Sequence, residues 1–480
     1  MLFNSTSYLL FFILFFIFYW YLFRENKKKN FLLLISSYLF YSFWDWKFLF
    51  LLLFSTLLDF YTGQKIFDSK SVNGKKKWLI MSMVINLGLL GVFKYYNFFV
   101  ESFSDLLKTI GFTINPSFLN IILPVGISFY TFHGISYLLD IYKNKITPEK
   151  EFSNYAVFVS FFPLLIAGPI ERASHLLPQI NKERKFEFNN AISGVKQILW
   201  GLFKKVVIAD TCALYSDTIF KNLYEFNGVL LFFGAILFSF QIYGDFSGYS
   251  DIASGSARLL GFELIKNFNF PYFSKNLGEF WKKWHISLSS WFRDYVYIPL
   301  GGNKIKQIRN VVIIFILSGF WHGANWTFIF WGGVNAIFVI ISMKIGNYIH
   351  KLNLDKNRFI NLFRISTTFV LTSLIWVLFR SENLAKAIYF YLKVKSDLFH
   401  FANYKETLFF INEKSLHNLI FLITFFMTVE YFGRSNNFAL EKINLKSKYL
   451  TKIFYYSIVS IVIYFLYSIE YKPNFIYFQF

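Results

Sequence analysis

Long runs of apolar residues, separated by short polar clusters, extend along almost the whole chain. About 20 consecutive apolar residues are needed to cross a bilayer core as a helix, so these runs predict transmembrane helices. The pattern predicts an all-α polytopic membrane protein with roughly a dozen membrane-embedded helices. The expected spans are 7–23, 31–43, 47–62, 78–98, 121–142, 153–170, 195–215, 228–243, 311–345 (long enough for two), 362–380, 416–433 and 452–470.

The stretch 240–300 interrupts this pattern, because Gly, Asp, Ser, Arg and His are scattered among its apolar residues. Non-helical backbone survives at membrane depth only where protein or a water-filled cavity surrounds it. We therefore expect a re-entrant, protein-enclosed core in this stretch rather than lipid-facing helices. The longest polar stretches, 171–192 and 346–360, have the length of loops, so residues 1–480 are expected to form a single membrane domain.

The charges support a membrane protein and exclude a nucleic-acid partner. Only 16% of the residues are charged, whereas about 25% is usual for a soluble domain. The net charge of +21 comes from short Lys and Arg clusters between apolar runs, at 24–29, 75–77, 143–145 and 182–185. This is the positive-inside pattern of cytoplasmic loops beside anionic lipid, not a basic face for nucleic acid.

The same bias predicts the orientation of a multi-pass protein in the cell (inner) membrane. The basic loops 24–30 and 65–77 are separated by two crossings, which puts both on the cytoplasmic side and the N-terminus outside. The only cysteine, Cys212, forms neither an intramolecular disulfide nor a thiolate metal site, and we expect no bound metal.

His322 is the first candidate for chemistry, because an ionisable residue in an apolar, tryptophan-rich run is expensive at membrane depth. Such a setting keeps imidazole neutral, and neutral imidazole can take a proton from an attacking hydroxyl. Gly319 and Gly323 are expected to leave room for a substrate chain beside the ring. Trp321 and Asn325 complete the expected surroundings. The alternative is a helix-packing histidine.

His285 is the second candidate, in the polar and aromatic stretch 280–303. The neighbouring Lys282 and Lys283 indicate a position nearer a membrane interface. A structural histidine remains an equally open interpretation here.

Charged residues form a second group around these histidines. Asp245, Asp251 and Arg258 fall within one apolar region, and the last two are seven residues apart, on one helical face. An internal ion pair between Asp251 and Arg258 is therefore expected, serving either scaffolding or substrate contact. Arg293 and Asp294 are adjacent, and adjacent residues do not face each other on a helix, so separate partners are expected.

The chain ends in FIYFQF (475–480), four aromatics among six residues. One hypothesis is interfacial anchoring, since aromatic rings favour the headgroup boundary. The other is that Tyr477 carries an acyl group in transit. A phenol has a pKa near 10, so this role needs a neighbouring base such as His322.

Three motifs resemble the membrane-bound O-acyltransferase (MBOAT) family, in the bacterial branch of alginate O-acetylation and D-alanyl-lipoteichoic acid transfer. They are DFSGYSDIASGSARLLGF (245–262), NFNFPYFSKNLGEFWKKWHISLSSWFRDYVYIPLGGN (267–303) and SGFWHGANWTFIFWGG (318–333). The resemblance implies about eleven transmembrane helices with re-entrant half-helices around a central tunnel. It also maps His322 onto the family's essential histidine and His285 onto its second one.

The activity implied by the resemblance is O-acetyl transfer from a cytoplasmic donor, acetyl-CoA, across the membrane to an exported polysaccharide or peptidoglycan. It also implies an extracytoplasmic partner of SGNH type, a glycan acceptor, surrounding membrane lipid and no tightly bound cofactor. D-alanyl transfer to teichoic acid is the alternative within the family. A non-enzymatic transporter or scaffold subunit of a glycan export complex is the alternative outside it.

Overall fold

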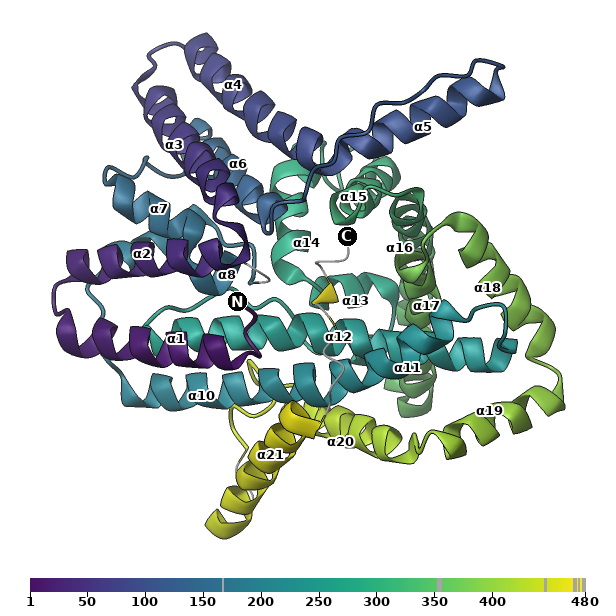
Figure 1. Cartoon of the computed structure of the whole chain (residues 1–480). Helices are drawn as coiled ribbons and strands as arrows, with labels where there is room; N and C mark the ends of the chain where they lie inside the picture. The colour runs from purple at the N-terminus through teal and green to yellow at the C-terminus, as the bar shows by residue number, and fades with distance from the viewer. Residues whose placement is uncertain (166–167, 352–355, 444–446, 469–472, 474, 477–480) are drawn as a thin grey trace. The chain divides into compact units, whose positions relative to one another are not determined.

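The computed structural model is all-helical, with no strand among the residues that it describes (Figure 1). These are residues 1–480 except 166–167, 352–355, 444–446, 469–472, 474 and 477–480. The predicted all-α class is confirmed. Contacts group the chain into two units: Met1–Ala191 with Ser256–Ile265, and Ile192–Gly255 with Lys266–Phe480. The expectation of a single domain over 1–480 stays a prediction.

The first unit is built around α6 (Ile127–Tyr142), whose residues are almost all buried. Helix α3 packs against both α4 and α6, and α2 packs against α7. Asp59 of α3 is 1% exposed and accepts hydrogen bonds from Asn86 (2.8 Å) and Ser82 (3.0 Å) of α4, so the buried carboxyl group is satisfied. The other helices are α1 (Thr6–Ile17), α2 (Asn26–Asp45), α3 (Lys47–Asp68), α4 (Val72–Leu90), α5 (Tyr96–Thr109), α7 (Phe152–Ser160), α8 (Phe162–Leu165) and α9 (Ala173–Asn181).

The second unit is organised on α12 (Gly228–Leu259), whose last turn belongs to the first unit. Helices before and after α12 complete the unit. They are α10 (Phe188–Leu202, beginning in the first unit), α11 (Asp210–Lys221), α13 (Leu277–Lys283), α14 (Ile286–Phe292), α15 (Gln307–His322), α16 (Trp326–Lys351), α17 (Arg358–Arg380), α18 (Leu384–Asp397), α19 (Phe401–Glu413), α20 (His417–Gly433) and α21 (Lys448–Ser468). The expected division of 311–345 into two helices is confirmed.

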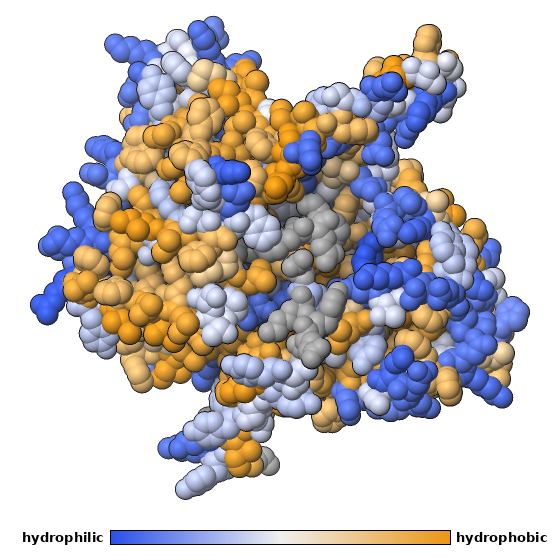
Figure 2. Space-filling view, in the orientation of Figure 1, coloured by the Kyte–Doolittle hydropathy of each residue, from blue (hydrophilic) through white to orange (hydrophobic). Residues whose placement is uncertain are grey.

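Exposed apolar side chains mark the surfaces that face lipid. Figure 2 shows them over α1 and α2, where Leu10, Leu14 and Phe31 are 58%, 58% and 60% exposed. Such clusters are unfavourable in water and match a hydrocarbon solvent. The protein is therefore a multi-pass membrane protein.

Five helical segments of the described chain are long and apolar enough to cross a membrane. They are Val72–Thr109, Gly228–Leu259, Trp326–Gly346, Arg358–Arg380 and Lys448–Ser468, and α19 with α20 makes a sixth as a pair bent by 89°. Several other expected spans are short: α1 has 12 residues and α7 has 9. The total of about eleven stays a prediction.

Residues 240–259 differ from the expected re-entrant backbone, because they continue α12 as one uninterrupted helix of 32 residues. The glycines there allow α12 to cross α10 at close range. A Cβ on Gly201 of α10 would lie 2.6 Å from the Gly248 carbonyl oxygen, and one on Gly248 would lie 2.8 Å from that of Gly201. Small residues thus allow two backbones to touch. Only after Leu259 does the chain become a series of short helices.

This crossing predicts that Gly248→Ala destabilises the protein, by about 1–3 kcal/mol as is typical of overpacking. The matched control is Gly333→Ala in α16, where an added Cβ meets nothing within 4 Å. Thermal unfolding in detergent, followed by size-exclusion chromatography, measures both. Equal melting temperatures for the two variants would contradict the role of the crossing.

Candidate active site

His285 lies in the turn between α13 and α14, and its ring is buried with the residue 1% exposed. Its backbone is left-handed (φ 44°), a conformation uncommon for residues other than glycine and often found at functional sites. The position near a membrane interface, expected from Lys282 and Lys283, stays a prediction. The turn directs the ring into the protein although Lys282 remains exposed.

Asn267, which the sequence analysis did not single out, contacts this ring. Its Oδ1 lies 3.1 Å from Nδ1 of His285 and accepts the Ser287 hydroxyl at 2.9 Å. Its backbone carbonyl accepts the Ile286 amide at 2.8 Å. Its position at the start of the second motif, 18 residues before His285, was the only signal in the sequence.

His322 ends α15, and the structure brings it to His285 with their ring centroids 6.5 Å apart. Aromatic rings enclose the pair. Trp321 lies 6.0 Å from the His285 ring, while Trp331 and Phe379 each lie 5.2 Å from the His322 ring. Two histidines that are 37 positions apart in the sequence thus share one aromatic enclosure.

A cavity of about 470 Å³ is lined by both histidines, chiefly with apolar side chains such as Ile286, Leu288 and Phe315. This volume falls in the usual range for small-molecule pockets. Burial lowers the pKa of His285, which lies outside the candidate membrane spans, to about 3. The ring is therefore neutral at physiological pH and able to accept a proton.

Two expectations about the surroundings of His322 are corrected. Gly319 and Gly323 make room for α16 rather than for substrate, because a Cβ at either position would lie within 2.2 Å of Phe328. Asn325 lies outside the cavity lining. Its side chain donates to the backbone carbonyl of Glu382 (2.9 Å), between α17 and α18, and accepts the Thr327 amide (2.9 Å). Asn325 thus connects the loop between α17 and α18 to the start of α16.

Asp245 belongs to a buried ion cluster in the second unit. Lys205, 1% exposed on the π-helical turn η3 (Phe203–Ala209), contacts Asp245 at 2.8 Å and Asp210 at 2.7 Å. The preceding Lys204 contacts Asp251 at 2.5 Å and Glu430 at 4.0 Å. The expected network exists, with lysines as its cations.

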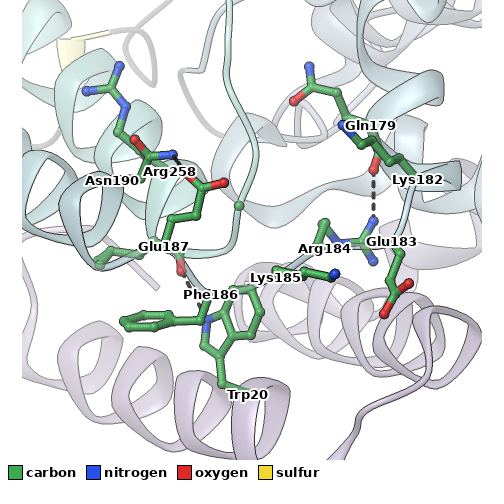
Figure 3. Close-up of a pocket in the computed structure, with 12 residues that line it drawn as sticks. Trp20, Gln179, Lys182, Glu183, Arg184, Lys185, Phe186, Glu187, Asn190 and Arg258 are labelled. Carbon is green, nitrogen blue, oxygen red and sulfur yellow. Dashed lines mark hydrogen bonds between the residues drawn. The ribbon is translucent and has the colours of Figure 1, made fainter.

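The expected ion pair between Asp251 and Arg258 is wrong, since Lys204 takes the place of the arginine. Arg258 belongs to the first unit and lines a separate pocket of about 200 Å³ (Figure 3). The buried Arg184 of that pocket donates to the carbonyl groups of Gln179 (3.0 Å) and Ile180 (2.9 Å). These bonds indicate a structural role for Arg184.

Arg293 and Asp294 pair with each other at 2.8 Å, so the expectation of separate partners is also wrong. The pair begins the π-helical turn η5 (Arg293–Tyr297), where the backbone departs from α-helical spacing. The long, 63% exposed arginine side chain can fold back onto its neighbour. An exposed pair of this kind contributes little stability.

The last described residues enter the second unit. Phe475 and Ile476 are 0% and 1% exposed, and the Phe475 ring lies 4.3 Å from that of Tyr249. The Ile476 amide donates to Asp245 at 2.7 Å. These two residues are therefore not interfacial. Tyr477 lies outside the described residues, and its role stays a prediction.

Comparisons with known proteins agree with the motifs. A model of the membrane-bound O-acyltransferase family matches residues 148–380. A probable alginate O-acetylase, AlgI, of Pseudomonas syringae pv. tomato is 38% identical over 410 residues, covering 84% of this chain and 76% of that protein. A peptidoglycan O-acetyltransferase of Helicobacter pylori is 36% identical over 385 residues, covering 74% and 72%. A teichoic acid D-alanyltransferase of Bacillus subtilis is 29% identical over 270 residues, covering 52% and 67%.

The ion cluster predicts that Lys205→Met strongly destabilises the protein, because Asp210 and Asp245 would remain buried without this cation. Breaking such a buried pair costs about 3–5 kcal/mol. The loss should appear as a lower midpoint of thermal unfolding in detergent.

The control is Lys414→Met, whose ion pair with Glu413 lies at the surface, and its midpoint should be nearly that of the native chain. A Lys205→Met midpoint equal to that of this control would show that the cluster is not a stabilising element.

Proposed function

Because the chain belongs to the membrane-bound O-acyltransferase family, we propose that it O-acetylates a cell-surface polysaccharide or peptidoglycan with acetyl groups from cytoplasmic acetyl-CoA. The observation that carries the proposal is the pair of histidines, His285 and His322, at one chiefly apolar cavity. The printed names of two relatives, for alginate and for peptidoglycan, support the acceptor class.

His322 is the proposed general base. It takes the proton of an acceptor hydroxyl as that oxygen attacks the thioester carbonyl of the donor. The carbon–sulfur bond then breaks, and the imidazolium returns its proton to the departing thiolate. The apolar lining of the cavity supports this assignment, because exclusion of water limits hydrolysis of the thioester.

Acetyl transfer is favoured over D-alanyl transfer by the extent of the similarity. The two O-acetyl-transferring relatives cover 84% and 74% of the chain, and the D-alanyltransferase covers 52%. We further propose that the protein lies in the inner membrane and passes the acetyl group to an extracytoplasmic partner of SGNH type.

Tyr477 is proposed as the carrier between donor and partner. The acetyl group would move from the thioester sulfur to the phenolic oxygen, with His322 taking the phenol proton, and then to the next acceptor hydroxyl. Support comes from Phe475 and Ile476, whose burial brings the preceding part of the tail into the second unit.

Substitution of the proposed base tests the function. His322→Ala should reduce acetyl transfer from labelled acetyl-CoA to glycan by about 10²–10⁴-fold in membrane vesicles, with normal protein levels. His285→Ala should also reduce it strongly. The matched control, His400→Ala, replaces an exposed histidine at the start of α19 and should keep full activity. Wild-type transfer by well-expressed His322→Ala would refute the assignment.

The tail is tested by Tyr477→Phe, which keeps the ring and removes only the hydroxyl group. We expect the acetyl content of the glycan to be lost at normal protein levels, because the carrier oxygen is gone. Unchanged acetyl content would reject the carrier role.

A further inference from the structure

Asn267 is held on three sides, so the orientation of its amide group is determined. It is 4% exposed, and its Nδ2 donates to the Ser250 hydroxyl of α12 at 3.1 Å. On the other side, Oδ1 accepts the Ser287 hydroxyl at 2.9 Å. The backbone bond from Ile286 to the Asn267 carbonyl fixes the main chain. The amide oxygen is therefore the atom that faces His285.

The contact between Oδ1 and Nδ1 of His285, at 3.1 Å, has a chemical consequence. An amide oxygen can only accept a hydrogen bond, so Nδ1 must carry the proton. In a neutral imidazole the lone pair then lies on Nε2. Asn267 thus selects one of the two tautomers of the ring.

Ring packing confines His285 in this orientation. Phe246 of α12 meets it edge to face with centroids 4.6 Å apart, and Trp321 lies 6.0 Å away on α15. His285 lines the cavity, whereas Asn267 does not. Nε2 lies on the side of the ring away from Asn267 and is itself buried.

We propose that Asn267 is a positioning residue that holds His285, one of the two histidines of the cavity, as the Nδ1–H tautomer with the lone pair on Nε2. Its effect on rate rests on the proposed function, while the tautomer itself does not. With Nε2 as an acceptor, His285 can accept a hydrogen bond from a hydroxyl group, while His322 remains the proposed base.

Other charged and titratable side chains occur on the elements around His285, and most are engaged elsewhere. Asp245 and Asp251 of α12 contact lysines of η3, and Lys283 of α13 pairs with Glu279. Further ones are His322 and Arg309 on α15, Lys266 before Asn267, Lys282 on α13, Tyr243, Tyr249 and Arg258 on α12, and Arg293 with Asp294 after α14.

The tautomer is measured directly by NMR of the protein with ¹⁵N-labelled histidine in nanodiscs. The spectra of His285 should show a protonated Nδ1 and an unprotonated Nε2 in the native chain. Asn267→Leu, which keeps the branched shape of the side chain but has no acceptor, should lose this preference. A protonated Nε2 in the native chain, or an unchanged tautomer in Asn267→Leu, would overturn the proposal even if the chain transfers no acetyl group.

The pH dependence of acetyl transfer gives a second test, which remains informative if Asn267→Leu fails to fold. In Asn267→Asp a carboxylate accepts from Nδ1 and favours the imidazolium, which raises the pKa of His285. Protonated His285 has no lone pair on Nε2. The decrease in the rate of acetyl transfer at acidic pH should therefore begin at a higher pH in this variant. Asn267→Leu, where folded, should lose at least about tenfold in kcat.

The matched control is Asn269→Asp, which adds the same charge two positions away, where Asn269 contacts Lys266 rather than His285. Its pH profile should be that of the native chain. If Asn267→Asp and Asn269→Asp give the same pH profile, Asn267 does not specifically control the protonation of His285, and the proposal fails. If all variants and the native chain lack transfer, the proposed function fails, and the NMR spectra still decide the tautomer.

Discussion

Polar groups at membrane depth must find their partners inside the protein, because lipid offers none. This constraint organises both units. In the first, Asp59 is satisfied by Asn86 and Ser82 across two helices. In the second, two consecutive lysines of η3 satisfy carboxylates from α11, α12 and α20. Polar contacts of this kind select helix neighbours in a setting where apolar surfaces discriminate poorly between lipid and protein.

Burial within the protein likewise determines what a reactive group can be. An imidazole enclosed by Phe246, Trp321 and its neighbours is neutral, since burial disfavours the charged form. It still needs a partner for its N–H group. Asn267 supplies a neutral acceptor, which orients His285 without raising the basicity that a carboxylate would confer. The orientation of the buried His285 ring thus depends on its contact with Asn267, a residue that does not line the cavity.

Much of the protein could be predicted from the sequence. Long apolar runs indicated helices, because a helix is the only open-ended structure that satisfies its own backbone in lipid. His322 and His285 stood out because an ionisable residue is costly in an apolar run. The wrong expectations concerned partners. Asp251 was paired with Arg258 from helical spacing, whereas its cation comes from another helix. Gly319 and Gly323 were assigned to substrate, whereas they accommodate Phe328.

The sequence by itself determined the helical class, the membrane setting and the two histidines, because hydrophobicity and its interruptions are local properties of the chain. Only the tertiary structure decided which groups meet. The contact between Asn267 and His285 needs a left-handed turn, and the cavity needs α13, α14 and α15 at close range. These contacts join residues 18 positions apart, for Asn267 and His285, and 37 positions apart, for the two histidines. They follow from how helices pack, which no single segment of the chain encodes.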